Sequence, residues 1–218
     1  MSAQDPVYVP VGDSALLVRF GEQMDAAANR RVHALAQRLR QQPLAGVGEA
    51  VPGYITLLIH YDPLVLTYDQ ILAWVRAQAA QAQDEADNAP RCVEIPVVYG
   101  GESGPDLAFV AAHTGLSADE VIRRHTAPTY TVYFIGFTPG FPYLGGMDVR
   151  LTAPRLETPR ARVPAGSVGI AGPQTGVYPL ESPGGWRIIG RTQLPLFDLA
   201  AQPPSLLSPG DAVRFVRA

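Results

Sequence analysis

The sequence contains no lysine, because all 17 of its basic residues are arginines. A phosphate-binding P-loop needs a lysine on the β- and γ-phosphates, and Schiff-base chemistry needs a lysine amine. This chain can therefore house neither kind of site. If the protein uses a nucleotide, we expect a second polypeptide to share the work of binding it.

Cysteine is almost absent as well. Cys92 is the only one, which excludes an internal disulfide, a CxxC redox pair and a cysteine-rich zinc site. The histidines show neither HxxxH nor HExxH spacing, so no metal site is predicted. His113 and His125 fall at predicted helix C-termini, where a positive charge suits the helix dipole. Only His60, in a predicted strand, is kept as a functional candidate.

Long apolar runs and a strong excess of charge are also missing. No stretch reaches the roughly 18 to 20 apolar residues that a membrane helix needs. The first ten residues have neither the charged nor the apolar region of a signal peptide. A net charge of −3 gives no general attraction to phosphate backbones. We expect a cytoplasmic globular protein that binds neither membranes nor nucleic acid.

The N-terminal part contains an internal repeat. Residues 12–20 resemble residues 53–61 at an offset of 41 residues. Each copy follows a short extended segment across a glycine-bearing turn and precedes a helix. The first helix is predicted from Asp25, its N-cap, to just before Pro43, and the second begins with the capping box Thr67/Gln70.

Two ββα units of this kind predict an α/β domain over residues 1–88, with both helices on one face of an antiparallel sheet. The polar stretch 81–91 separates this domain from the strand-like segment 93–99, so the domain boundary is predicted between residues 88 and 89.

The C-terminal part, residues 89–218, has a different character. Two short helices are predicted at 105–113 and 117–125, the second with a Ser117/Glu120 capping box, and a strand at 129–135. From residue 136 to residue 192, 19 of the 57 residues are glycine or proline. This composition predicts short strands and tight turns in a closed barrel or a sandwich. The candidate strands are 167–171, 176–180, 186–190 and 212–216.

The loop at 136–146 is the first candidate binding element. It places three aromatic residues among four glycines and two prolines. Glycines let the backbone approach a ligand, prolines hold a loop in place, and aromatic rings provide a binding wall. The candidates are Phe137, Gly140, Phe141 and Tyr143. The alternative is a hydrophobic plug over one mouth of the barrel.

A basic segment follows this loop. Arg150, Arg155, Arg160 and Arg162 are separated by prolines and accompanied by one acid, Glu157. Guanidinium groups bind carboxylates and phosphates through paired hydrogen bonds. The segment therefore predicts contact with an anionic substrate or a nucleotide phosphate, with Arg160 assigned to catalysis. A solvated loop held by salt bridges is the alternative.

The densest set of polar candidates comes next. Glu181 is the plausible carboxylate for acid–base work in this run, with a surface carboxylate as the alternative. Ser167 lacks the glycine two residues earlier that a GxSxG nucleophile elbow requires, so it is a catalytic candidate only as a hydrogen-bonding group. Gly166, which begins this glycine-rich stretch, is a binding candidate. The remaining candidates are Gln174, Thr175, Tyr178 and Ser182.

Taken together, these motifs resemble one family, that of the 5-oxoprolinase B subunit. The family includes proteins called allophanate hydrolase subunit 1 and Kip-type inhibitors of a sporulation kinase. The residues that carry the resemblance are 136–146, 154–155, 159–160, 163–172, 174–176, 178–186, 190–192 and 209–211, with further matches at 12–13, 60–63, 100–102 and 104–106. The similarity covers nearly the whole chain.

The resemblance implies an N-terminal α/β domain followed by a cyclophilin-like β-barrel. It also implies partners, subunits A and C, that act with this chain to open 5-oxoproline to glutamate with ATP, Mg²⁺ entering only with the nucleotide. The chain is expected to be inactive alone. Arg155, Arg160 and the backbone of 166–172 would stabilise developing negative charge.

Two other functions stay open. The chain could be a binding module that inhibits a sensor histidine kinase without chemistry, or part of a carboxyl-transfer enzyme of the urea carboxylase type with a biotin-carrying partner. A homo-oligomer is also open. Genes for subunits A and C beside this one would favour the hydrolase, and a neighbouring sensor kinase would favour the inhibitor.

Overall fold

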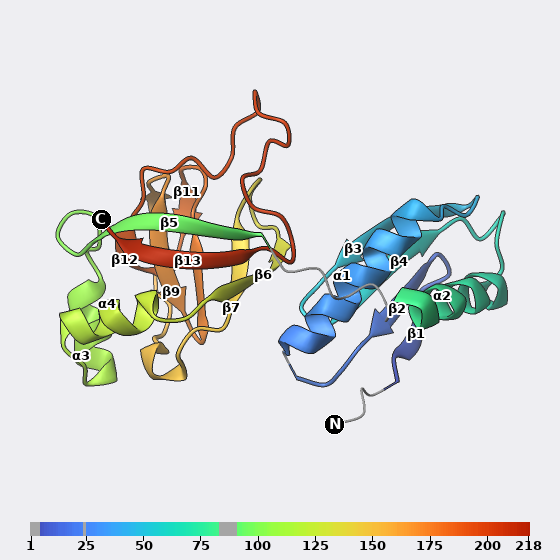
Figure 1. Cartoon of the computed structure of the whole chain (residues 1–218), viewed down its shortest axis with the longest axis horizontal. Helices are drawn as coiled ribbons and strands as arrows, with labels where there is room; N and C mark the ends of the chain where they lie inside the picture. Colours follow the sequence, from blue (N-terminus) through green and yellow to red (C-terminus); the bar gives the residue numbers. More distant parts are fainter. Residues whose placement is uncertain (1–4, 24, 83–90) are drawn as a thin grey trace. The chain divides into compact units, whose positions relative to one another are not determined.

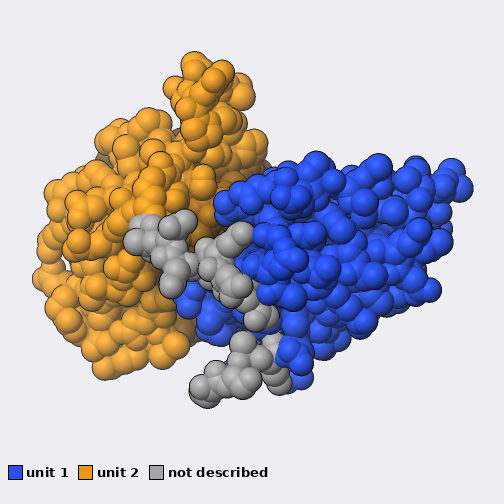
Figure 2. Space-filling view, turned by 45° about the vertical axis from the view of Figure 1, so that its right-hand side comes forward, with its two compact units in different colours: residues 1–89 blue, residues 90–218 orange. Residues whose placement is uncertain are grey.

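The computed structural model describes residues 5–23, 25–82 and 91–218 of the chain. The chain divides into two compact units, residues 1–89 and residues 90–218 (Figure 2). The predicted boundary between residues 88 and 89 lies outside the described residues. Each unit has its own hydrophobic core.

The first unit is a four-stranded antiparallel sheet covered on one face by two helices (Figure 1). In chain order its elements are β1 (Val7–Val11), β2 (Ala15–Arg19), α1 (Ala26–Gln41), β3 (Val47–Pro52), β4 (Thr56–Tyr61) and α2 (Tyr68–Ala82). The strand order is β1-β2-β4-β3. The two predicted ββα units are confirmed.

Pairing between the two repeats sets which face is buried. Leu16 lies opposite Ile59 and Val18 lies opposite Leu57, and all four side chains are buried under the helices. Because side chains alternate along a strand, this register turns one apolar set from each strand toward α1 and α2.

The predicted helix starts in the first unit are confirmed by their hydrogen bonds. The Asp25 carboxylate accepts from the backbone N–H groups of Ala27 and Ala28, at 3.1 and 3.4 Å. At the second helix, Thr67 N donates to Gln70 Oε1 at 2.8 Å and Gln70 N donates to Thr67 Oγ1 at 3.3 Å. These bonds satisfy N–H groups that the first helical turn leaves open.

The second unit is a closed seven-stranded barrel, which confirms the expected barrel. Its strands are β5 (Cys92–Tyr99), β6 (Tyr130–Ile135), β7 (Pro142–Gly145), β9 (Ser167–Ala171), β10 (Gln174–Val177), β12 (Arg187–Arg191) and β13 (Ala212–Arg217). They close in the order β10-β7-β6-β13-β5-β12-β9. β13 runs parallel to β5, whereas the other neighbouring strands are antiparallel.

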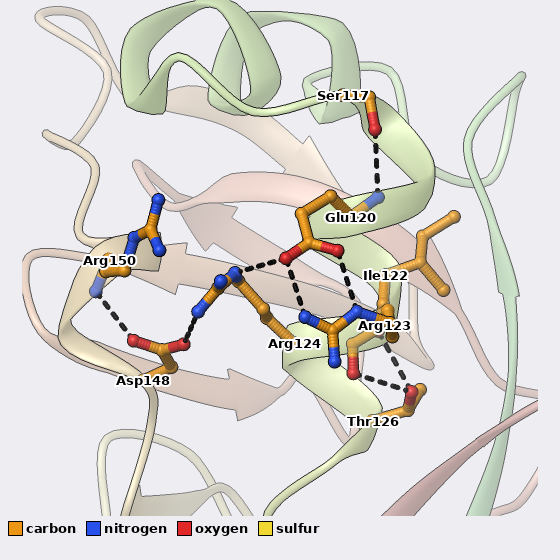
Figure 3. A network of polar contacts seen from close by, with 8 residues as sticks. All are labelled: Ser117, Glu120, Ile122, Arg123, Arg124, Thr126, Asp148 and Arg150. Carbon is orange, nitrogen blue, oxygen red and sulfur yellow. Dashed lines mark hydrogen bonds and ion pairs between the residues drawn. The ribbon is translucent and has the colours of Figure 1, made fainter.

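Two helices, α3 (Leu107–Thr114) and α4 (Ala118–Thr126), connect β5 to β6. Buried side chains of both, among them Val110 and Val121, belong to the barrel core. A network of ion pairs links α4 to the short 3-10 helix η2 (Val149–Leu151) (Figure 3). Arg124 bridges Glu120 and Asp148 at 2.7 and 2.6 Å. The predicted Ser117 cap is confirmed, since its hydroxyl accepts from Glu120 N.

One predicted strand, residues 176–180, was wrong in its bounds. The strand is β10, Gln174–Val177, and it ends before Tyr178. Gly172, with φ of 56°, makes a tight turn after β9. The returning strand therefore begins at Gln174, opposite Ala171, two residues earlier than predicted. Beyond the barrel, β8 (Arg160–Val163) pairs with β11 (Ser182–Gly184) in a separate two-stranded sheet.

The expectation of a positively charged His125 at a helix end was also wrong. Its ring is fully buried, and burial lowers the pKa of the imidazole to about 3. Nε2 lies 2.9 Å from Thr175 Oγ1, whose proton goes to Gly169 O at 3.0 Å. Nε2 must therefore carry the imidazole hydrogen, and Nδ1 accepts from the Tyr99 hydroxyl at 2.8 Å.

No helix among the described residues has both the length and the apolar character needed to cross a membrane.

Candidate functional site

The candidate site is a group of aromatic rings on the barrel unit, here called the aromatic site: Phe137, Phe141, Tyr143, Tyr178 and Trp186. Phe141, Tyr178 and Trp186 are buried, and their ring centroids lie 5.3 to 6.4 Å apart in edge-to-face contacts. Phe137 stands on this base with 62% of its surface exposed. The predicted loop therefore offers solvent one aromatic ring supported by a rigid apolar layer.

The backbone at Phe137 is strained. Its φ of 63° lies in the left-handed region, which favours glycine. Thr138 N donates to Gly136 O at 2.7 Å, which closes a tight turn around Phe137, and Phe141 N donates to Thr138 O at 3.0 Å. Such strain costs on the order of 1 to 3 kcal/mol and is typical of functional sites, where surrounding contacts hold it.

The predicted arginines differ in how their charges are used. Arg160 is held by Asp106 at 2.9 Å, and Asp106, which is buried, also accepts from Ile188 N at 2.7 Å. Arg162 pairs with Glu181 at 2.7 Å. Arg155 has no ion pair in the described part of the chain, and its guanidinium lies 6.0 Å from the ring centroid of Trp186. Of these three, Arg155 alone keeps an uncompensated charge beside the aromatic site.

Tyr178 contributes a buried hydroxyl to the site. Burial raises the pKa of this phenol, while a hydrogen bond with the backbone of Trp186 and the charges of Arg155 and Arg160 act in the opposite direction. The hydroxyl is therefore protonated at neutral pH and can donate a hydrogen bond. Gly184 lies directly beneath it, because a Cβ at this position would come within 2.4 Å of the Tyr178 oxygen.

Several predicted candidates lie in the barrel wall instead of at the surface. Ser167 and Thr175 are buried, and Thr175 is bonded to His125 and Gly169. The N–H of Gly166 donates to Tyr178 O at 2.7 Å. Gln174 is half-buried at the start of β10. These residues support the strand that leads into Tyr178.

The remaining candidates lie on the β8–β11 sheet. Glu181 is exposed and paired with Arg162, which is also exposed. Ser182 lies opposite Val163, and its hydroxyl is buried without a hydrogen-bond partner in the described residues. Gly140 is buried in the loop, where a Cβ would come within 2.9 Å of Phe197 Cβ. The structure thus gathers Phe137, Phe141, Tyr143, Tyr178, Arg155 and Arg160, and leaves the Arg162–Glu181 pair as a separate contact.

Two residues of the site escaped sequence reasoning. Asp106 reads as a helix cap, yet its carboxylate makes no capping bond to α3 and instead holds Arg160. The nearby Gly104 is the sequence signal that could have pointed to this segment. A Cβ on Gly104 would come within 2.1 Å of Ile189 O, and such close backbone approach requires glycine. Trp186 ends the Pro183-Gly184-Gly185 turn, and its position along the chain does not by itself indicate the contact with Phe141.

The arrangement suits a small anionic ring compound. Aromatic faces pack against a flat ring, and a free guanidinium binds a carboxylate or a phosphate oxygen pair. Among the described residues, no group of three or more histidine, cysteine, aspartate or glutamate side chains could hold a metal ion.

The sequence is similar to known proteins over most of its length. Residues 6–207 match the family model described as "Carboxyltransferase domain, subdomain C and D". A relative from Bacillus subtilis, named as the B subunit of 5-oxoprolinase, is 46% identical, with 95% of this chain and 90% of the relative covered. A relative of the same name from Escherichia coli O157:H7 is 50% identical, covering 94% and 93%.

More distant and longer proteins are also similar. A urea amidolyase from Saccharomyces cerevisiae is 25% identical, and the match covers 96% of this chain but 13% of the yeast protein. Among solved structures, TTHA0988 is 43% identical with a TM-score of 0.81. The match covers 94% of this chain and only 40% of the TTHA0988 chain.

Proposed function

Because the chain belongs to the carboxyltransferase subdomain C and D family and is nearly half identical to two proteins named as B subunits of 5-oxoprolinase, we propose that it is the B subunit of such an enzyme. The complex would open 5-oxo-L-proline to L-glutamate with hydrolysis of ATP. The observation that carries this proposal is identity of 46% and 50% over at least 90% of both proteins in each pair.

The aromatic site supplies the substrate contacts in this proposal. The substrate 5-oxoproline is a small ring that carries one carboxylate. Phe137 and the buried rings beneath it would pack against the ring, and Arg155, uncompensated beside Trp186, would bind the carboxylate. Arg160, whose position is set by Asp106, would face the charge that develops on the lactam oxygen.

A lactam is a poor electrophile, so ATP serves to activate its oxygen before the ring opens. This chain has no lysine for the phosphates, and the partner subunits, proposed to be A and C, would complete the nucleotide site. The isolated chain would then be inactive, and the complex would work in the cytoplasm. Catalytic roles for Glu181 and Ser167 stay predictions.

The urea carboxylase alternative is not favoured. The urea amidolyase is 25% identical, and this chain covers only 13% of its length, whereas the 5-oxoprolinase subunits match over nearly their whole length. A biotin-dependent turnover of urea by the complex would reverse this preference. The sensor-kinase inhibitor stays a hypothesis that binding to a kinase would support.

The test is reconstitution with subunits A and C from the same genome, followed by release of ADP and glutamate. We expect ADP release that depends on 5-oxoproline and on all three subunits. Complex formation without such release would overturn the proposed function.

Two variants then test the site itself. Arg155→Ala should raise the KM for 5-oxoproline about tenfold or more, the cost of one charge-assisted contact. Phe137→Ala should also raise it without loss of folding, because this ring is exposed, whereas truncating the buried Phe141 would open a cavity. Arg214→Ala is the matched control, since its guanidinium lies on β13 and pairs with Glu94 at 3.4 Å, and it should leave the KM unchanged. Normal KM values for both site variants would remove the aromatic site from the proposal.

A further inference from the structure

The barrel unit carries a projecting segment that the proposed function does not use. Residues 197–205, here called the finger, rise from the barrel as the red loop in Figure 1 and as the projection of the second unit in Figure 2. Phe197 pairs with Ser205 in an isolated bridge, and Asp198 N donates to Pro204 O at 2.8 Å. The finger is therefore a narrow, closed hairpin.

Hydrogen bonds and core contacts fix this hairpin at both ends. At its tip, Ala200 N donates to Asp198 Oδ1 at 2.9 Å and Ala201 N donates to Asp198 O at 3.1 Å. At its base, Leu196 and Leu207 are buried in the barrel core. A segment held in this way loses little conformational entropy when it binds.

The tip of the finger exposes a large apolar side chain. Residues 198–204 are all exposed, and Leu199 has 85% of its surface in solvent. Asp198 is the one charged residue of the finger, and its exposed carboxylate accepts a hydrogen bond from Ala200 N within the turn. Burying a leucine side chain contributes about 1.5 to 3 kcal/mol, so Leu199 fits an apolar pocket on another protein.

The base of the finger touches the loop of the aromatic site. Gly140, whose φ is 80°, lies so close to Phe197 that a Cβ on it would come within 2.9 Å of Phe197 Cβ. Gly140 follows Phe137 by three residues in the same loop. A protein that grips the finger would therefore be attached beside the loop that presents Phe137.

We propose that the finger is a docking element for a partner polypeptide of the same enzyme, with Leu199 inserted in an apolar pocket of that partner. This inference rests on the proposed function. It fits the relatives, whose names describe them as one subunit of an enzyme. It also fits TTHA0988, in which the segment similar to this chain belongs to a longer polypeptide. The exposed Leu199 at the tip specifies an apolar pocket on the partner.

The experiment measures the affinity of the full-length chain for a preparation of subunits A and C. Leu199→Asp is compared with Leu64→Asp, a matched control because Leu64 lies in the first unit and is 94% exposed. Leu199→Asp should weaken binding at least about tenfold, whereas Leu64→Asp should stay within about twofold of the wild type, as expected of a surface substitution. Both variants should keep the wild-type melting temperature.

ADP release provides a second measurement. If the finger acts through docking, Leu199→Asp should lose 5-oxoproline-dependent ADP release at low subunit concentration and recover it when subunits A and C are raised. A Leu199→Asp variant that binds like the wild type overturns the finger proposal and leaves the proposed function standing. If the wild-type chain is a dimer and Leu199→Asp makes it a monomer, the finger binds a second copy of this chain, and the finger proposal is overturned. Failure of the wild-type chain to bind A and C overturns both proposals.

Discussion

At the residue scale, two nearby arginines differ in whether an acidic side chain pairs with them. Arg160 and Arg155 are five residues apart in one basic segment, yet Arg160 is tied to the buried Asp106 and Arg155 is not. Removing Arg160 would leave the buried carboxylate of Asp106 without a counter-ion, which destabilises the fold. Arg160 therefore has a structural role in addition to its proposed catalytic role. Arg155 is the residue whose removal should change substrate binding alone.

His125 makes stability depend on pH. Its pKa is about 3 in the folded protein, because burial disfavours the cation, against about 6.5 when unfolded. Between these values the unfolded chain binds a proton that the folded chain does not, so the free energy of unfolding falls as pH drops below 6.5, by about 1.4 kcal/mol per pH unit. Denaturant unfolding at pH 7 and pH 5 measures this loss.

A His125→Gln variant should lack this part of the pH dependence. His113→Gln, a change at an exposed histidine on α3, should keep the wild-type dependence. Equal slopes for the wild type and His125→Gln would mean that the buried imidazole is not the titrating group.

At the scale of elements, the turns on either side of β9 use glycine for two different reasons. Gly166 and Gly172 both have positive φ, 82° and 56°. A Cβ on Gly166 would come within 2.1 Å of Thr192 O, whereas a Cβ on Gly172 would meet open space. Backbone conformation alone demands glycine at 172, while conformation and packing together demand it at 166.

Alanine substitutions separate these two demands. Gly172→Ala should cost about 1 kcal/mol, the strain of a left-handed alanine, with the fold retained. Gly166→Ala should cost more than about 3 kcal/mol, because the neighbouring group is backbone and cannot turn aside. Thermal unfolding of the two variants measures the difference. Equal losses of stability in the two variants would show that the backbone around Gly166 can shift to accommodate a methyl group.

At the scale of the whole molecule, the two units have separate cores and one tryptophan each. Leu35 lies in the core of the first unit, and Trp74 packs against that core. Leu144 lies in the core of the barrel. Trp186 lies in the adjoining cluster of the barrel unit. Each tryptophan is therefore a reporter for its own unit.

Core truncations should act on one unit at a time. Leu35→Ala should destabilise the first unit by about 2 to 5 kcal/mol and shift the unfolding transition seen by Trp74 alone. Leu144→Ala should shift only the transition seen by Trp186. Each is measured by fluorescence in chains that keep a single tryptophan. A joint shift of both transitions would show that the units unfold as one.

Much of this architecture was predictable from local patterns. Helix caps and turns depend on residues that are close together in the sequence, so they can be predicted from it. This holds for the Asp25 cap, the Thr67/Gln70 capping box, the Gly/Pro-rich turns and the ββα pattern within each copy of the repeat. The resemblance of residues 136–146 and 178–186 to a known family predicted the relatives that the sequence proved to have.

Only the tertiary structure decided which side chains meet. Asp106 reaches Arg160 across 54 positions of sequence, and His125 reaches Thr175 across 50. No local pattern encodes such pairings, because they depend on barrel closure. Burial then fixed the charge on His125. Among the described residues, Arg155 is left without an ion pair beside Trp186. The sequence by itself determined the elements, the family and the absence of a lysine-based phosphate site, and barrel closure determined the aromatic site.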